Sequence, residues 1–187
     1  RRQRQMCIRD RVRDYLSHSE KAQRMADGLR EIVEMAGSRN IADTPITVVI
    51  EDFDDRNSPI ACVSGMQWFA EQVPGLCFTF DTGNFIIHGE DIFAAWEELK
   101  DKVVHVHCKD RKISSDKPLQ TQKNATPDIK ECYLPAAVGE GCIPIKELVY
   151  KMKEYGYRGY LAIEHFDAAD QEAYMQKSAA NLQEYCS

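Results

Sequence analysis

Four strand-like segments of the chain end in side chains that can bind a metal ion. The segments VVIE, CFTFD, VVHVH and YLAIE end at Glu51, Asp81, His107 and Glu164. A single acid at the end of a strand usually begins a solvated loop, but four such residues in equivalent places indicate a site. Three carboxylates and one imidazole form a hard, oxygen-rich ligand set, which suits Mn²⁺, Mg²⁺, Co²⁺ or Zn²⁺ and disfavours copper or an iron–sulfur cluster.

Helical patterns separate these strands and predict how the four residues are brought together. Apolar residues recur at helical spacing within 65–72, 92–99 and 145–152, and again after Asp170. Strands that alternate with helices are typical of parallel βα units with right-handed crossovers. Because all parallel strands run the same way, their carboxyl ends face one side of the sheet, where sites are built. We therefore expect an α/β fold in which the four residues converge.

A helix precedes the first of these strands. Ser17 and Glu20 match a capping box, and the apolar residues that follow recur at helical spacing until Gly37. The apolar side of this helix needs a sheet to cover, yet no strand comes before it in the sequence. We therefore expect the first βα units of the fold to be missing from this chain.

Two segments are predicted to be loops. Residues 111–137 are polar, contain three prolines and show no periodicity. Asp52, Asp54 and Asp55 follow the first strand; they could hint at a second metal, but a solvated acidic turn is the preferred interpretation.

Length and charge limit the classes of function. With 187 residues the chain can form one sizeable domain, which we place at 14–187, but it is short for a closed barrel of about 250 residues. The net charge is −6, although residues 1–13 carry +5. The acidic remainder disfavours nucleic-acid binding. We interpret 1–13, which looks like translated adapter sequence, as a basic or artefactual start outside the domain. It also lacks the apolar core of a secretory signal.

Composition predicts an ordinary globular protein of the cytoplasm. Hydrophobic residues make up 43% and charged residues 29% of the chain, and no apolar run approaches the roughly 18 residues of a membrane helix. The seven cysteines are scattered, without a C-x-x-C pair. They are therefore predicted to be buried, reduced thiols, and we expect no membrane span and a cytoplasmic location.

An ordered set of motifs resembles a known family. VVIEDF, FDTGN, HVHCKD, VGEG and GYLAIEHF, which carry the four candidate ligands, together resemble the xylose-isomerase-like TIM-barrel superfamily, specifically its sugar phosphate isomerases and epimerases. The likeness runs from about Ile46 to the C-terminus. It implies a (β/α)₈ TIM-barrel type of fold, of which this chain supplies the C-terminal part, and one divalent metal held by Glu51, Asp81, His107 and Glu164.

The resemblance also implies a reaction. In such enzymes the two metal-binding glutamates face each other across the substrate, so Glu51 and Glu164 are expected to be the catalytic acid and base. The metal (Mn, Co, Mg or Zn) would stabilise an enediolate after a proton is removed next to a carbonyl. The expected partner is a small sugar or sugar phosphate, with neither nucleic acid nor membrane, and a homo-oligomer is left open.

Four further residues are candidates for substrate binding: Asn84, His105, Lys109 and Arg111. Asn84 stands where some related ketose epimerases carry a histidine. His105 lies on the same strand face as His107, one pleat deeper, and is expected to support or pack beside it rather than to coordinate the ion. Lys109 and Arg111 could bind a phosphate or carboxylate of the substrate, or could be solvated surface charges.

Three alternatives stay open. An inosose-type dehydratase would use the same metal and base but expel water. An endonuclease-IV-like AP endonuclease would need more histidines and a basic groove than this chain with five histidines offers. A non-catalytic sugar-binding barrel would bind its ligand without turnover.

Overall fold

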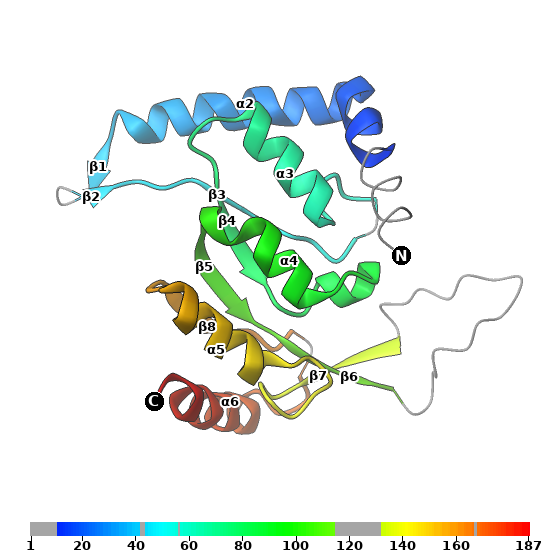
Figure 1. Cartoon of the computed structure of the whole chain (residues 1–187), viewed down its shortest axis with the longest axis vertical. Coiled ribbons are helices and arrows are strands. Elements are labelled where there is room, and N and C mark those ends of the chain that lie inside the picture. The colour runs from blue at the N-terminus through cyan, green and yellow to red at the C-terminus, as the bar shows by residue number, and fades with distance from the viewer. Residues whose placement is uncertain (1–10, 42–43, 56, 115–131, 167) are drawn as a thin grey trace, which may run out of the picture.

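A four-stranded parallel sheet forms the centre of the molecule. The computed structural model describes residues 11–41, 44–55, 57–114, 132–166 and 168–187. The sheet has the order β3-β4-β5-β8, and its strands are Val49–Glu51, Cys77–Asp81, Val103–Cys108 and Tyr160–Ile163 (Figure 1). Every neighbouring pair is parallel, so the predicted α/β class with parallel strands is confirmed.

The register of the strands aligns their carboxyl ends. Asp81 of β4 lies opposite His107 of β5, and His107 lies opposite Ala162 of β8. The ladder continues past the last strand, because the backbone N–H of Glu164 donates to the carbonyl of Cys108 at 3.1 Å. The four strand ends therefore meet at one edge of the sheet.

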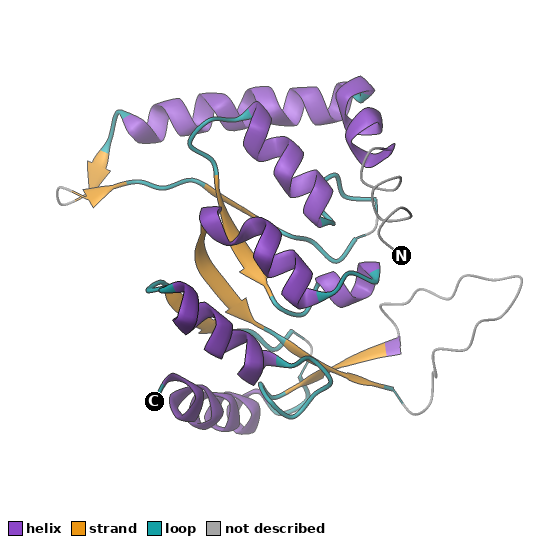
Figure 2. Cartoon of the chain, viewed as in Figure 1, coloured by secondary structure: helices purple, strands orange, loops and turns teal. Residues whose placement is uncertain are grey.

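Helices cover one face of this sheet (Figure 2). The helices are α2 (Glu20–Gly37), α3 (Val63–Gln72), α4 (Ile92–Leu99), α5 (Ile145–Tyr155) and α6 (Gln171–Cys186). Phe78 and Phe80 of β4 pack with Val106 of β5 and Trp96 of α4 in one apolar core. The apolar periodicity of these segments thus reflects burial against the sheet.

The opposite face of the sheet is more open. Side chains alternate along a strand, so Val49 shares a face with Glu51, and Tyr160 shares a face with Glu164. Val49 is 38% exposed and Tyr160 is 81% exposed. Parallel sheets are usually buried on both faces, whereas the described residues cover only one face of this sheet.

The prediction of the first helix boundary was wrong. Residues 11–18 are already helical, and Ser17 lies in that helix with its hydroxyl donating to the carbonyl of Arg13. Ser19 caps α2 instead, because its side chain accepts from the backbone N–H of Ala22. The S-x-x-E pattern was misleading because the chain is helical on both sides of Ser19, which the pattern alone does not reveal. The end at Gly37 was correct.

The prediction of a featureless loop over residues 111–137 was also wrong. β6 (Asp110–Ile113) pairs antiparallel with β7 (Tyr133–Ala136), with Asp110 opposite Ala136. Each strand obtains its hydrogen bonds from the other, 20 or more residues away, so neither carries a strong local signal. The middle of the predicted loop, 115–131, lies outside the described residues.

The first parallel strand is shorter than its β-branched sequence indicates. β3 begins only at Val49, and Ile46 is exposed before it. Two short strands, β1 (Asn40–Ile41) and β2 (Thr44–Pro45), form an antiparallel pair before it. Among the described strands β3 pairs with β4 alone, so it lies at the edge of the sheet.

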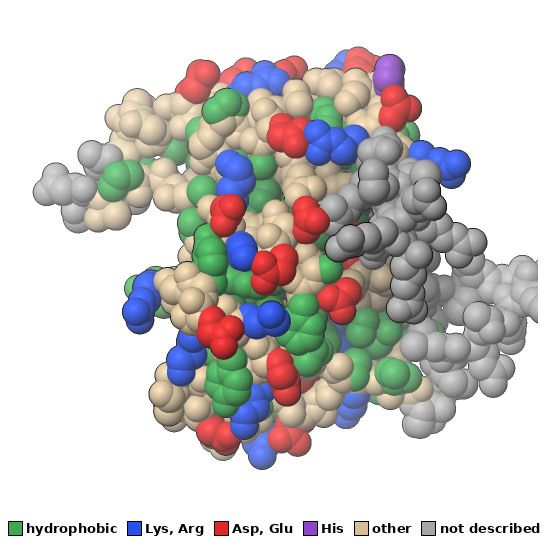
Figure 3. All heavy atoms as spheres, viewed as in Figure 1, with side chains coloured by type: hydrophobic (Ala, Val, Ile, Leu, Met, Phe, Trp, Pro, Cys, Tyr) green, Lys and Arg blue, Asp and Glu red, His purple; other side chains and the backbone are tan. Residues whose placement is uncertain are grey.

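The helical face carries charges of both signs. Among the described residues seen from this side, lysine, arginine, aspartate and glutamate side chains are interspersed, without a large basic patch (Figure 3). In the part of the chain that the structure describes, no helix has both the length and the apolar character needed to cross a membrane. Six described cysteines are free thiols; Cys142 and Cys186 are exposed, so the expectation that all cysteines are buried was wrong.

Two glycines inside helices give a matched test of this packing. At Gly65 in α3 a Cβ would overlap the carbonyl oxygen of Pro59, whereas at Gly28 in α2 a Cβ meets open space. We expect Gly65→Ala to lower the free energy of unfolding by about 1–3 kcal/mol through overpacking. We expect Gly28→Ala to raise it by about 0.5–1 kcal/mol, because alanine is the better helix former. Urea unfolding followed by circular dichroism measures both; equal effects would contradict the packing.

Candidate metal centre

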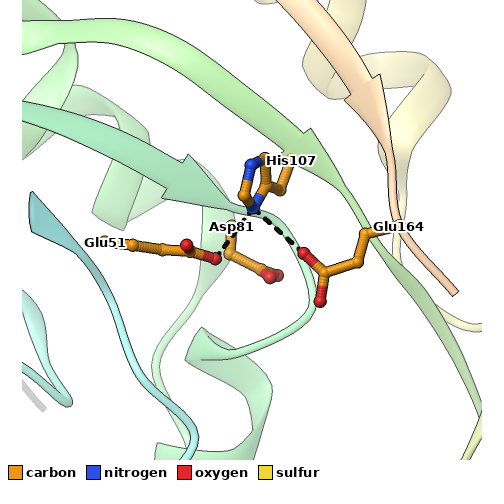
Figure 4. Close-up of side chains that lie close together, drawn as sticks. All are labelled: Glu51, Asp81, His107 and Glu164. Atoms are coloured by element: carbon orange, nitrogen blue, oxygen red, sulfur yellow. Dashed lines mark hydrogen bonds and ion pairs between the residues drawn. The ribbon is translucent and has the colours of Figure 1, made fainter. Parts of the chain in front are cut away.

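The structure brings together the four residues that the sequence singled out. Glu51 ends β3, Asp81 ends β4, His107 lies near the end of β5, and Glu164 directly follows β8. One potential ligand atom of each lies within 4.8 Å of those of all the others. Figure 4 shows the four side chains pointing toward one another, with Glu51 and Glu164 on opposite sides.

His107 connects the two glutamates. Its Nδ1 lies 2.9 Å from Oε1 of Glu51 and 3.0 Å from Oε2 of Glu164. These hydrogen bonds to Glu164 and Glu51 raise the pKa of His107 to about 10. The bond to His107, together with Lys109, lowers the pKa of Glu164 to about 2. His107 thus lies between the two glutamates and pairs with both of them.

Asp81 is the buried member of the cluster. Its Oδ1 accepts a hydrogen bond from the backbone N–H of Gly83 at 2.7 Å, and its Oδ2 accepts one from Nζ of Lys109 at 2.9 Å. Burial raises the pKa of Asp81 to about 6 against the opposing effect of Lys109. The orientation of this carboxylate is thus fixed by both of its oxygens.

Asp52 corrects the prediction of a solvated acidic turn. It is completely buried, and its Oδ1 accepts a hydrogen bond from the backbone N–H of Asp81 at 2.8 Å. Its carbonyl oxygen accepts a hydrogen bond from Nδ2 of Asn84. Burial and the nearby Asp81 raise the pKa of Asp52 well above its usual range. Asp52 joins the ends of β3 and β4, a role that its acidic neighbours in the sequence concealed.

Two of the four substrate-binding candidates brace the loop after β4. Arg111 is only 8% exposed; its Nε donates to the carbonyl of Gly83 at 2.6 Å, and its Nη2 donates to Oδ1 of Asn84 at 3.2 Å. Asn84 is buried as well. Both residues lie beside the cluster, and their contact with a substrate stays a prediction.

The other two candidates lie in and beside the cluster. Lys109 contacts Asp81 and Glu164 through its ammonium group. The ring of His105 meets that of His107 edge-on, with 5.2 Å between the centroids, and His105 is not one of the four grouped residues. Burial lowers the pKa of His105, and the neighbouring His107 lowers it further. This placement fits a supporting histidine, and substrate contact by either residue stays a prediction.

Asp110 holds the VGEG turn, a function that the sequence did not reveal. Its carboxylate accepts backbone N–H groups from the three residues Gly139, Gly141 and Ile143. A Cβ at Gly141 would overlap this carboxylate, so glycine is needed there for close approach. The acidic residue of HVHCKD is therefore structural. A signal was available in retrospect, because VGEG offers several closely spaced N–H groups.

The residues present fit a divalent metal ion. Three carboxylates and one imidazole converge, and within the described residues only His107 and Lys109 are seen to bring positive charge into contact with them. Oxygen ligands with one imidazole suit Mg²⁺, Mn²⁺, Co²⁺ or Zn²⁺. Glu51, Asp81, His107 and Glu164 would hold the ion.

Comparisons with known proteins agree with this fold. Over 86 residues, 46% of this chain, it is 28% identical to an inosose dehydratase from Lacticaseibacillus casei. It superposes on a xylose isomerase domain protein from Planctomyces limnophilus with a TM-score of 0.63 and 19% identity, covering 90% of this chain. On D-psicose 3-epimerase from Clostridium cellulolyticum H10 the TM-score is 0.61, with 16% identity and 90% coverage of this chain. At these identities the two structural likenesses show the fold alone.

The chain spans only part of each of these proteins. It covers 28% of the length of the inosose dehydratase, 53% of the Planctomyces protein and 57% of the epimerase. The model of one family, described as xylose isomerase-like TIM barrel, matches residues 8–185. That match covers nearly the whole chain. The parallel strands of the chain, with helices on one face, form part of such a barrel. The chain therefore belongs to the xylose isomerase-like TIM barrel family.

Proposed function

We propose that this chain carries the catalytic centre of a metal-dependent isomerase or epimerase that acts on a sugar or sugar phosphate. The observation that carries the proposal is the convergence of Glu51, Asp81, His107 and Glu164 from four neighbouring strand ends. The four side chains could act as ligands of one ion, and Glu51 and Glu164 lie on opposite sides of the cluster. Membership of the xylose isomerase-like TIM barrel family, and a fold shared with a D-psicose 3-epimerase, support the proposal.

Glu51 and Glu164 are placed to remove a proton from a substrate lying between them and to return one. Their side chains are 37% and 31% exposed, so a ligand above the strand ends can reach both. Glu164 contacts His107 and Lys109, which hold its carboxylate in place at the strand end. A base on one face of a substrate and an acid on the other can invert a carbon centre or move a carbonyl group. The divalent ion would supply Lewis-acid stabilisation of the negative charge that develops on the substrate oxygen.

Loss of water from the substrate is the second candidate reaction. The likeness to an inosose dehydratase over 46% of the chain favours it. Such a reaction uses the same initial proton removal and differs in the fate of a neighbouring hydroxyl group. The four residues would keep their roles as ligands in both reactions, and Glu164 its role as base.

The remaining alternatives find less support. The formal net charge of −6 is unfavourable for binding abasic DNA, and cleavage of such DNA by metal-loaded protein would contradict the proposal. A non-catalytic sugar-binding protein would bind its ligand equally well after Glu164→Gln, because it would make no use of a base.

The metal assignment predicts a specific loss on mutation. We expect the wild-type chain to bind one Mn²⁺ or Co²⁺ per molecule, and His107→Ala to weaken binding by at least the roughly 10- to 100-fold that loss of a supporting partner costs. Isothermal titration calorimetry and metal analysis measure this. His18→Ala changes an exposed histidine that is remote in sequence from the four ligands. It is the control and should bind the ion as wild type does. Full retention of the ion by His107→Ala would refute the assignment.

The base assignment predicts a loss of proton transfer. With ketoses in D₂O, wild-type protein should incorporate deuterium at the carbon next to the carbonyl, which NMR detects. Glu164→Gln should slow this exchange by about 10²- to 10⁴-fold, the usual contribution of a general base. Glu184→Gln, at an exposed glutamate of α6, is the matched control. Undiminished exchange in a folded, metal-loaded Glu164→Gln protein would exclude Glu164 as the base.

Mass spectrometry of the products separates the two candidate reactions. Epimerisation or isomerisation leaves the mass of the sugar unchanged apart from deuterium, because only a proton is moved. Dehydration lowers the mass by one water. We expect no loss of water with ketoses; loss of water from inososes, with no exchange in ketoses, would establish the dehydratase instead.

A further inference from the structure

Hydrogen bonds from Thr82 hold the backbone of Lys109. The hydroxyl of Thr82, which is almost fully buried, accepts a hydrogen bond from the backbone N–H of Lys109 at 2.9 Å and donates one to its carbonyl at 2.8 Å. The backbone N–H of Thr82 in turn donates to the carbonyl of His107. The loop after β4 is thereby fastened to the end of β5, and the Lys109 backbone is fixed from both sides.

The side chain of Lys109 packs closely against Gly83. Its stem crosses Gly83 so closely that a Cβ on that glycine would lie 2.6 Å from Cγ and 2.7 Å from Cδ of the lysine. Real Cβ atoms do not approach other atoms so closely, so only glycine leaves room for the stem. The stem of a solvated surface lysine needs no such space.

The ammonium group of Lys109 meets three acceptors. They are Oδ2 of Asp81 at 2.9 Å, a carboxylate oxygen of Glu164, and Oδ1 of Asn84 at 3.5 Å. An ammonium group has three N–H donors, so these contacts can engage all of them. The side chain is only 11% exposed. A substrate anion would have to compete with two carboxylates for this group.

We propose that Lys109 is a resident counter-ion of the carboxylate cluster, which holds Asp81 and Glu164 in place while no metal is bound and weakens divalent-ion binding by competing for the same oxygens. This inference rests on the proposed metal centre and adds a determinant of its affinity. An ammonium group and a divalent cation repel each other, and in a partly buried site this repulsion is poorly screened.

The proposal predicts opposite effects of one substitution on two properties. In Lys109→Met, the metal-free protein should unfold at a lower temperature, because Asp81 and Glu164 lose their partner. The same protein should bind Mn²⁺ more tightly, by about tenfold or more, since one nearby positive charge has been removed. The increase in melting temperature caused by saturating Mn²⁺ should therefore be larger than in wild type.

Calorimetric titration with MnCl₂ and thermal unfolding with and without the ion measure these effects. Lys112→Met removes the same charge from an exposed position on β6 and should match wild type in both measurements. Lys109→Gln keeps a polar group of shorter reach and is the second variant if the methionine protein does not fold. It should also bind Mn²⁺ more tightly than wild type.

Each outcome decides the proposal. Tighter Mn²⁺ binding by the Lys109 variants together with lower metal-free stability supports it. If wild type binds Mn²⁺ and the folded variants bind it equally or more weakly, the counter-ion role is wrong while the metal centre stands. If neither wild type nor the variants bind a divalent ion, the metal centre itself fails, and the counter-ion role fails with it.

Discussion

Negative charge concentrated at one end of the sheet is the constraint on which the rest of the site depends. Glu51, Asp81 and Glu164 approach one another because parallel strands in register bring their ends together. Carboxylates this close destabilise the fold unless positive charge is placed between them. His107 and Lys109 provide that charge from the end of β5. The end of β5 thus compensates the negative charge of the carboxylates on the neighbouring strands.

The surrounding residues keep this arrangement rigid through backbone hydrogen bonds. Asp52 accepts a hydrogen bond from the backbone N–H of Asp81, and Thr82 accepts one from that of Lys109. Asp110 accepts hydrogen bonds from backbone N–H groups of the VGEG turn. Side chains that bind backbone groups restrict the loops more strongly than contacts between flexible side chains can. Preorganisation of this kind is what a metal or proton-transfer site requires, because misplaced ligands lose affinity and rate.

Sequence patterns predicted those features that repeat with local periodicity. Strands followed by acids or histidine, together with amphipathic helices between them, sufficed to expect that Glu51, Asp81, His107 and Glu164 converge. The parts that failed depend on partners distant in sequence. Asp52 looks like part of a solvated acidic run until its bond to Asp81 is seen, and β6 has no strand signal without β7. Ser17 was taken for the cap because Glu20 completes an S-x-x-E pattern with it, whereas the true cap, Ser19, is followed three residues later by Ala22 and shows no such pattern.

The position of Glu51 on an edge strand has a consequence for how a bound ion would be released. β3 is only three residues long and pairs with β4 alone among the described strands, whereas Asp81 and His107 lie on interior strands. Short edge strands open locally at a lower free energy than the interior of a sheet, as amide hydrogen exchange detects. If a divalent ion is bound there, brief detachment of β3 would remove Glu51 from it and let the ion exchange with solvent. The lifetime of a bound metal would then be governed by this local fluctuation, independently of global unfolding.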